Sequence, residues 1–327
     1  TTSKADAASS TGSGPATQPT EAQRVLGQLT AAMNRDLGDF VIVAAVTRIE
    51  GGRESADKGV IFLGAAKGDA WLANVYRVGP ARAMSGEPDP YNPASVAPAD
   101  WPNLDARKFL AAAKEYEPVS SLVVRGGRLA QLLYNPDTKA AVWYDSDLRA
   151  WMNLDKPGDP VLKLMLRGSS GIAPVLDGAA EMVKENPPSG KSLGQALLLR
   201  KKLEWPGQAD APPVTQENVI WFDGESHLPA EAVTRWIDQD GTTRFEERIS
   251  DVKCVKLGGQ WQVESWQAST YYPRDKKSSP AQRTRVQRLS GQDVPDWLFK
   301  NVPVARPTVK SPVEQTLKLT EGSAGAA

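Results

Sequence analysis

Histidine and cysteine are almost absent from this chain of 327 residues, since each occurs once, as His227 and Cys254. A zinc, haem-thiolate or iron–sulfur site needs several such side chains, so the chain cannot assemble one by itself. A nucleophile with a histidine base would have to use His227, which stands in the turn-like segment DGESHLP and is expected at the solvated surface. A single cysteine forms no intrachain disulfide, and we expect a buried free thiol. The composition therefore predicts no metal and no cofactor.

Net charge and long apolar runs are also lacking. Lysine plus arginine and aspartate plus glutamate both number 39, so no general field attracts nucleic acid, and we expect no nucleic-acid partner. No run approaches the roughly 20 apolar residues that span a bilayer. Residues 1–19 are rich in Ser, Thr, Ala and Gly and lack an initiating methionine. We expect a disordered leader of an exported protein, free or tethered by an N-terminal lipid anchor; the other interpretation is a flexible end added for expression.

Helix signals occur at the start and in the middle of the chain. Thr20 and Gln23 form a capping-box pattern. The helix that they begin is expected to end near residue 38 and to place five apolar residues on one face: Val25, Leu26, Leu29, Ala32 and Met33. Further helices are predicted over 104–116, 160–167 and 172–184. Between them, residues 79–103 contain six prolines and predict a long excursion or lid.

Turn residues divide the remaining apolar runs into strands. In VVRGGRLAQLLYNPDTKAAVWYD (123–145), Gly-Gly and Asn-Pro-Asp separate three short runs and predict an antiparallel meander. The other predicted strands are 40–48, 59–65, 70–78, 192–205, 217–223, 231–238, 244–257, 260–272 and 282–289. Runs such as FVIVAAV are apolar on both faces, so both faces are expected to be covered. We predict an α+β fold: a large curled antiparallel sheet of about ten strands, forming a half-open β-barrel with helices packed over its concave side.

Motifs that would point to catalysis are incomplete. SGKS at 189–192 lacks the upstream glycine of a phosphate-binding loop. GSSG at 168–171 does not match the GxSxG nucleophile elbow, because its second glycine comes one residue too early. DQDG at 238–241 is better explained as a hairpin turn than as a calcium loop. Acidic residues are abundant, so a hydrolase with two carboxylates stays open as an alternative. We expect that the chain is not an enzyme.

Tryptophan is the strongest remaining signal, because several of the ten fall inside predicted strands. Each one by itself is explained by an ordinary core. Together with a curling sheet, covering helices and a proline-rich lid, they favour an enclosed apolar cavity for a hydrophobic ligand. The residues expected to line it are Val43, Phe62, Trp71, Leu133, Trp143, Trp221, Trp236 and Trp266.

The order of these elements resembles the outer-membrane lipoprotein-sorting (LolA-like and LolB-like) family of the bacterial periplasm. The resemblance is carried by AQRVLGQLTAAM leading into FVIVAAVTR, by the meander at 123–145, by VIWFDGESHLPAEAVTRWIDQDGTTRFEERISDVK and by the closing DVPDWLF. It covers residues 20–305 and implies an unclosed barrel with a helical lid that carries acyl chains of lipoproteins, or lipids. In that family an arginine of an early strand bonds to the lid. Arg77 is the nearest candidate here, and the role is not transferred to it.

The expected organisation is a leader (1–19), one half-barrel domain (20–305, with 79–116 as an insertion) and a loosely held tail (306–327). The expected function is noncatalytic periplasmic binding or carriage of lipoprotein acyl chains or lipid. An envelope membrane protein is a further expected partner. The alternatives are an interaction or regulatory module that senses lipid or lipoprotein, and a hydrolase acting on glycans or lipids.

Overall fold

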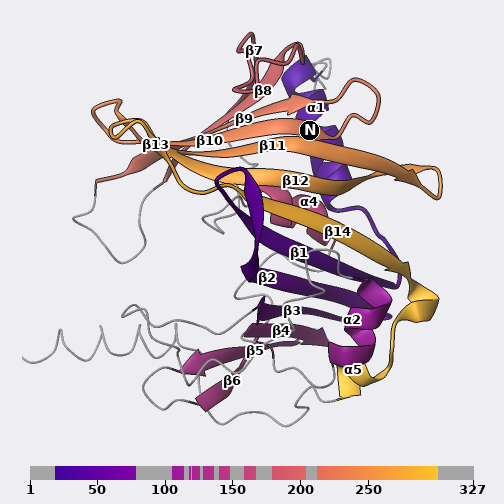
Figure 1. Cartoon of the computed structure of the whole chain (residues 1–327). Coiled ribbons are helices and arrows are strands. Elements are labelled where there is room, and N and C mark those ends of the chain that lie inside the picture. Colours follow the sequence, from indigo (N-terminus) through magenta and orange to yellow (C-terminus); the bar gives the residue numbers. More distant parts are fainter. Residues whose placement is uncertain are drawn as a thin grey trace, which may run out of the picture.

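The computed structural model describes residues 19–78, 105–113, 118, 120–125, 128–135, 140–147, 158–166, 179–203 and 212–300. Within them, one antiparallel sheet runs in the order β6-β5-β4-β3-β2-β1-β14-β12-β11-β10-β9-β8-β7, and the two-residue strand β13 pairs with β12 (Figure 1). The strands are β1 Phe40–Glu50, β2 Arg53–Lys67, β3 Ala70–Val78, β4 Ser120–Arg125, β5 Arg128–Asn135, β6 Ala140–Asp147, β7 Ala179–Val183, β8 Ala196–Leu203, β9 Val214–Phe222, β10 Pro229–Ile237, β11 Thr243–Leu257, β12 Gln260–Tyr272, β13 Lys277–Ser278 and β14 Gln282–Ser290. The helices are α1 Glu21–Met33, α2 Ala106–Ala112, α4 Pro160–Leu166, the short 3-10 helix η3 Gly291–Asp293 and α5 Trp297–Lys300.

The predicted large, open antiparallel sheet is confirmed, with β6 and β7 at its two ends. The expected number of strands is wrong, because the described residues form fourteen strands and not about ten. The predicted helix over 172–184 is wrong where the structure describes it, because Ala179–Val183 pairs with β8 as a strand. At these residues, backbone hydrogen bonding to the edge of β8 outweighs the helix preference that the spacing of the apolar residues indicates. Residues 1–18 of the leader, the whole proline-rich excursion (79–103) and the C-terminal tail lie outside the described residues.

The central strand β1 joins the two ends of the chain, since it pairs with β2 on one side and with β14 on the other. Its first six residues are all buried. Phe40, Ile42 and Ala44 belong to one apolar cluster, and the odd-numbered residues between them belong to a second. Because alternate residues of a strand point to opposite faces, the sheet is covered on both sides at β1, as the sequence predicted.

Different helices cover the two faces (Figure 1). Helices α1 and α4 contribute to the cluster of Ile42, on what we call the α1–α4 face. Residues of α2 and α5 join the cluster of Val43, on the α2–α5 face, where Phe109 packs edge-on against Tyr76.

The sequence expectation for α1 is confirmed in detail. The Gln23 backbone N–H donates to Thr20 Oγ1 at 3.2 Å, and the Thr20 N–H donates to Gln23 Oε1 at 2.8 Å.

A third cluster lies on the α2–α5 side of β8, β9 and β10, beneath the segment 184–195. Trp221 is fully buried there, and its indole Nε1 donates to the Glu185 carbonyl at 2.8 Å. The segment is also held by an ion pair from Glu185 to Arg235 and by Lys191, whose Nζ lies 3.9 Å from Glu231 Oε1. We call the segment 184–195 the strap. It supplies an apolar cover and a carbonyl acceptor for the indole N–H, which explains how a tryptophan is buried at this position.

Candidate ligand-binding face

The α1–α4 face is a continuous apolar surface that runs from β8 to β2. The strand residues buried on it are Leu197, Leu199, Ile220, Ala232, Ile249, Val263, Trp266, Ala268, Val286, Phe40, Ile42, Ala44 and Ala66. The covering residues come from α1 (Ala22, Leu29 and Met33) and from α4. A surface of this kind is what an acyl chain requires, because its binding energy is the burial of methylene groups.

Helix α4 fills the middle of this face. It is only seven residues long, yet Val161, Leu162, Met165 and Leu166 are at most 5 % exposed. The pocket left between Leu166 and strands β9, β10 and β11 has a volume of about 10 Å³. That is room for no more than one water molecule. A hydrophobic ligand on the middle of this face would therefore have to take the place of α4 side chains.

The start of α4 is docked on the end of α1. Asp159 is the residue before the helix, and its Oδ1 accepts from the Val161 N–H at 3.0 Å and the Leu162 N–H at 3.3 Å. Its own N–H donates to the Met33 carbonyl at 2.8 Å. Gly158 has φ +57°, and a Cβ at this position would lie 2.2 Å from the Met33 oxygen. The approach of the two helices therefore requires glycine at 158.

One ion pair ties the same junction. Arg35, just after α1, donates from Nη2 to Asp159 Oδ2 at 3.0 Å, and the Asp159 side chain is 1 % exposed. A second arginine, Arg288 of β14, is paired with Ile42 in the sheet register and so shares the α1–α4 face. Its Nη1 donates to the Val263 carbonyl at 2.6 Å. Burial lowers the pKa of this guanidinium, against the opposing effect of the Asp159 carboxylate.

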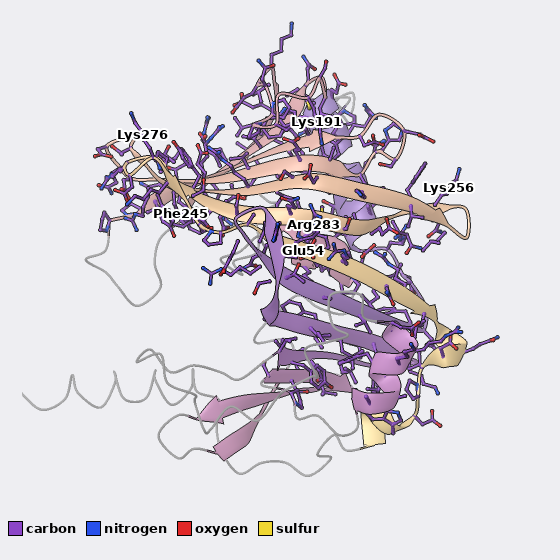
Figure 2. All side chains as sticks on the ribbon, in the orientation of Figure 1. Glu54, Lys191, Phe245, Lys256, Lys276 and Arg283 are labelled. Carbon is purple, nitrogen blue, oxygen red and sulfur yellow. The ribbon has the colours of Figure 1, made fainter. Side chains whose placement is uncertain are left out.

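Two larger pockets open at the ends of the face. Near β13, a pocket of about 440 Å³ is lined by Arg48, Phe245, Glu247 and Tyr272 among others. Glu247 also borders the small pocket under α4, so the two adjoin. Phe245, labelled in Figure 2, stacks on Trp236 with ring centroids 5.6 Å apart. At the other end, about 400 Å³ lies between α1 and the β9–β10 turn, where His227 is exposed as predicted.

The opposite face carries ion pairs as well as apolar clusters over the same strands. A row of ion pairs crosses it from β7 to β11: Glu181–Arg200, Arg200–Glu217, Glu217–Arg235 and Arg235–Glu246. Glu54 of β2 meets Arg283 and Arg285 of β14, with 2.5 Å between Glu54 Oε2 and Arg285 Nη1 (Figure 2). This hydrogen bond holds the pKa of Glu54 below its usual value. The apolar residues of the opposite face fall in two separate clusters, one under α2 and α5 and one under the segment 184–195, whereas the apolar surface of the α1–α4 face is continuous from β8 to β2.

The eight residues predicted to line a cavity do not come together. Phe62, Trp71 and Trp266 pack on the α1–α4 cluster, and Trp236 shares that face by its spacing from Ala232. Val43 lies on the α2–α5 face, and Trp221 lies in the cluster under the strap. The backbone of β5 and β6 pairs Leu133 with Val142 and Trp143 with Leu132, but the side chains of Leu133 and Trp143 lie outside the described part of the structure.

Sequence reasoning missed Arg35, Asp159 and Arg288. One local signal was available: Gly-Asp-Pro at 158–160 is a helix start with an aspartate cap and proline in the first turn. Nothing local joins Arg35 to Asp159, which are 124 residues apart. No three His, Cys, Asp or Glu side chains of the described residues are grouped so that they could hold a metal ion.

Comparison with known proteins finds distant structural similarity only. No family model and no curated protein matches the sequence. A crystal structure of a domain from Vibrio parahaemolyticus, described as an outer membrane lipoprotein-sorting protein, is 10% identical with a TM-score of 0.40, over 85% of this chain and 95% of that one. A LolA superfamily protein from Nitrosomonas europaea is 11% identical with a TM-score of 0.37, over 86% of this chain and 99% of that one. Both are described as proteins of the family that the sequence motifs resemble. Within the described residues, no helix has the length and hydropathy needed to span a membrane.

Proposed function

We propose that this chain binds and carries a hydrophobic ligand, an acyl chain of a lipoprotein or of a lipid, on the α1–α4 face, and that it catalyses no reaction. One observation supports the proposal above others. A continuous apolar surface of strands β8–β12, β14 and β1 is covered in its middle by a seven-residue helix that is anchored at its first residues. An apolar sheet face with a small, separately anchored cover is suited to exchanging that cover for a ligand.

The free energy gained by burying a long acyl chain on this face is similar to that lost when the α4 side chains leave it. Burying the four α4 side chains on this face contributes about 6–12 kcal/mol, at about 1.5–3 kcal/mol each. A chain with about 14 methylene groups contributes about 11 kcal/mol on the same scale. A ligand of that length can therefore replace α4 without a large net cost, whereas a short chain cannot. In this proposal the helices act as the lid over the concave side of the half-barrel, and Phe62, Trp71, Trp236 and Trp266 form part of the wall.

The sequence motifs of the lipoprotein-sorting family favour the periplasm as the compartment. A lipoprotein or an envelope membrane protein would then deliver or receive the acyl chain. The same motifs favour residues 20–305 as one domain, with 1–19 as its leader and 306–327 as its tail.

A second candidate function is an interaction module that senses lipid or a lipoprotein partner. The sizes of the pockets favour this function. The pocket under α4 has a volume of about 10 Å³, whereas the pockets at the two ends of the face have volumes of about 440 Å³ and 400 Å³. Open pockets suit the side chains of a partner protein better than a whole acyl chain.

Native mass spectrometry of full-length protein purified without detergent, with extraction and identification of bound lipid, tests the first proposal. We expect a co-purifying acyl compound, and binding of the neutral probe N-phenyl-1-naphthylamine that long-chain lipids displace. Protein that carries no lipid and binds neither the probe nor any long-chain lipid would contradict it. If such protein still captures one specific envelope protein, the second candidate holds.

A further inference from the structure

Two arginines on the α1–α4 face have buried nitrogens without a hydrogen-bond partner in the described part of the structure. Nε of Arg35 and both Nε and Nη2 of Arg288 are shielded from solvent and have no hydrogen-bond partner among the described residues. A buried donor without an acceptor is unfavourable, and more so when it carries charge. These nitrogens belong to guanidinium groups, which stay protonated and present a planar fork suited to carboxylate or phosphate oxygens.

Arg288 occupies a place where the sheet splays. The pairing of β12 with β14 runs from Ala268↔Gln282 to Ser265↔Arg285 and is not continued beyond it. This leaves the Val263 carbonyl for the Arg288 side chain, which bonds it through Nη1. The remaining edge of the fork, Nε and Nη2, is the edge with which arginine binds an oxyanion in bidentate fashion. It belongs to a side chain on the same face as Ile42 and Val286, which contact the apolar cluster under α4.

The charges at this junction do not balance. Among the described residues, Arg35 and Arg288 are two cations, and Asp159 is the buried carboxylate that Arg35 bonds directly and whose charge acts on Arg288. Glu264 also acts on Arg288, but it is exposed to solvent. Asp159 is already bonded by Arg35 and by two backbone N–H groups of α4. If α4 leaves the face, its Asp159 leaves with it, and two guanidinium groups are left beside the apolar residues of the α1–α4 face.

We propose that the ligand of this face is an anionic amphiphile, and that α4 imitates it. The carboxylate of Asp159 takes the place of the ligand's anionic head between Arg35 and Arg288, and the apolar side chains of α4 take the place of its hydrocarbon chain. This inference rests on the proposed function and deepens it by naming the head group, a carboxylate as in a fatty acid or a phosphate as in a phospholipid.

The test compares three ligands with the same chain: hexadecanoate, hexadecyl phosphate and the neutral hexadecanol. Each displaces N-phenyl-1-naphthylamine from the full-length protein at pH 8, below the concentration at which it forms micelles. We expect at least one anionic ligand to bind about tenfold or more tightly than hexadecanol, because a hydrogen bond to a charged group is worth at least that factor. Which anion is preferred identifies the head group.

The variants R288M and R35M are expected to lower the ratio of the affinity for the preferred anion to that for hexadecanol about tenfold. The ratio is the readout because R35M also removes the ion pair to Asp159 and so loosens α4, which affects both ligands alike. R285M is the matched control, since Arg285 lies on the same strand but pairs with Glu54 on the other face. It should keep the preference. D159N should tighten binding of the anion, because the lid loses its competing charge. Should R288M fail to fold, R35M and D159N still decide.

Equal binding of the three ligands by the native protein, or an anion preference that survives both R288M and R35M, would overturn the inference and leave the carrier function intact. Failure of all three to bind would instead refute the proposed function.

Discussion

Replacing Gly158 with alanine should loosen α4 from the α1–α4 face. The new Cβ would lie 2.2 Å from the Met33 carbonyl oxygen and 3.1 Å from the Asn34 Cα, both backbone atoms that cannot rotate away. The positive φ of +57° adds a further cost of about 1–2 kcal/mol for a residue with a Cβ. If the junction opens to relieve the contact, the bond from the Asp159 N–H to Met33 is lost, at about 1 kcal/mol. The sum is about 2–3 kcal/mol against the docked helix.

Two measurements report this change. Urea unfolding should show a loss of no more than about 3 kcal/mol, since the strain is relieved once α4 undocks. Binding of N-phenyl-1-naphthylamine should tighten, by up to about thirtyfold for 2 kcal/mol, because a larger fraction of molecules has the apolar face open.

Gly194→Ala is the matched control for this experiment. Gly194 also has a positive φ, of +77°, but a Cβ there would meet nothing within 4 Å. The control should therefore lose about 1–2 kcal/mol of stability and leave probe binding unchanged. Equal behaviour of the two variants, or unchanged probe binding in Gly158→Ala despite lost stability, would refute the idea that α4 covers a ligand-binding face.

Two further changes test the separation of the two faces. Trp266→Phe alters the α1–α4 face and should weaken N-phenyl-1-naphthylamine binding severalfold. Trp221→Phe alters the cluster under the segment 184–195 and should leave probe binding unchanged. It should lower the free energy of unfolding in urea by about 1–3 kcal/mol, because the Glu185 carbonyl loses its hydrogen-bond donor. The reverse pattern would mean that the ligand binds the opposite face. For Glu54, whose folded pKa lies below its unfolded value of about 4.3, the stabilisation is fully present above that value and is lost as the pH falls through the folded pKa. Glu54→Gln should therefore be less stable than the native protein in urea unfolding at pH 7, and the two should converge below about pH 4; a constant difference down to pH 2 would contradict this.

Features governed by neighbouring residues could be read from the sequence. The capping box of α1 and the three strands of the predicted meander depend on contacts within a few residues, and the structure has them where the sequence predicts them. The turn residues 126–127 and 136–139 lie outside the described part of the structure. The all-apolar run of β1 likewise indicated cover on both faces. The strand β7 was missed because its apolar spacing suits a helix, and only the free edge of β8 decides otherwise.

The candidate site was decided by tertiary structure. Composition marked the tryptophans as notable, but the face that each one occupies depends on strand register and on which distant segment covers it. Trp221 and Trp266 illustrate this, since a strap covers one and α4 the other. The junction of Arg35, Asp159 and Arg288 joins the end of the first helix, the start of a later one and the last long strand. Such long-range proximity has no local signal, because it arises only when the antiparallel pairing of β1 with β14 brings the two ends of the sequence together beneath α4.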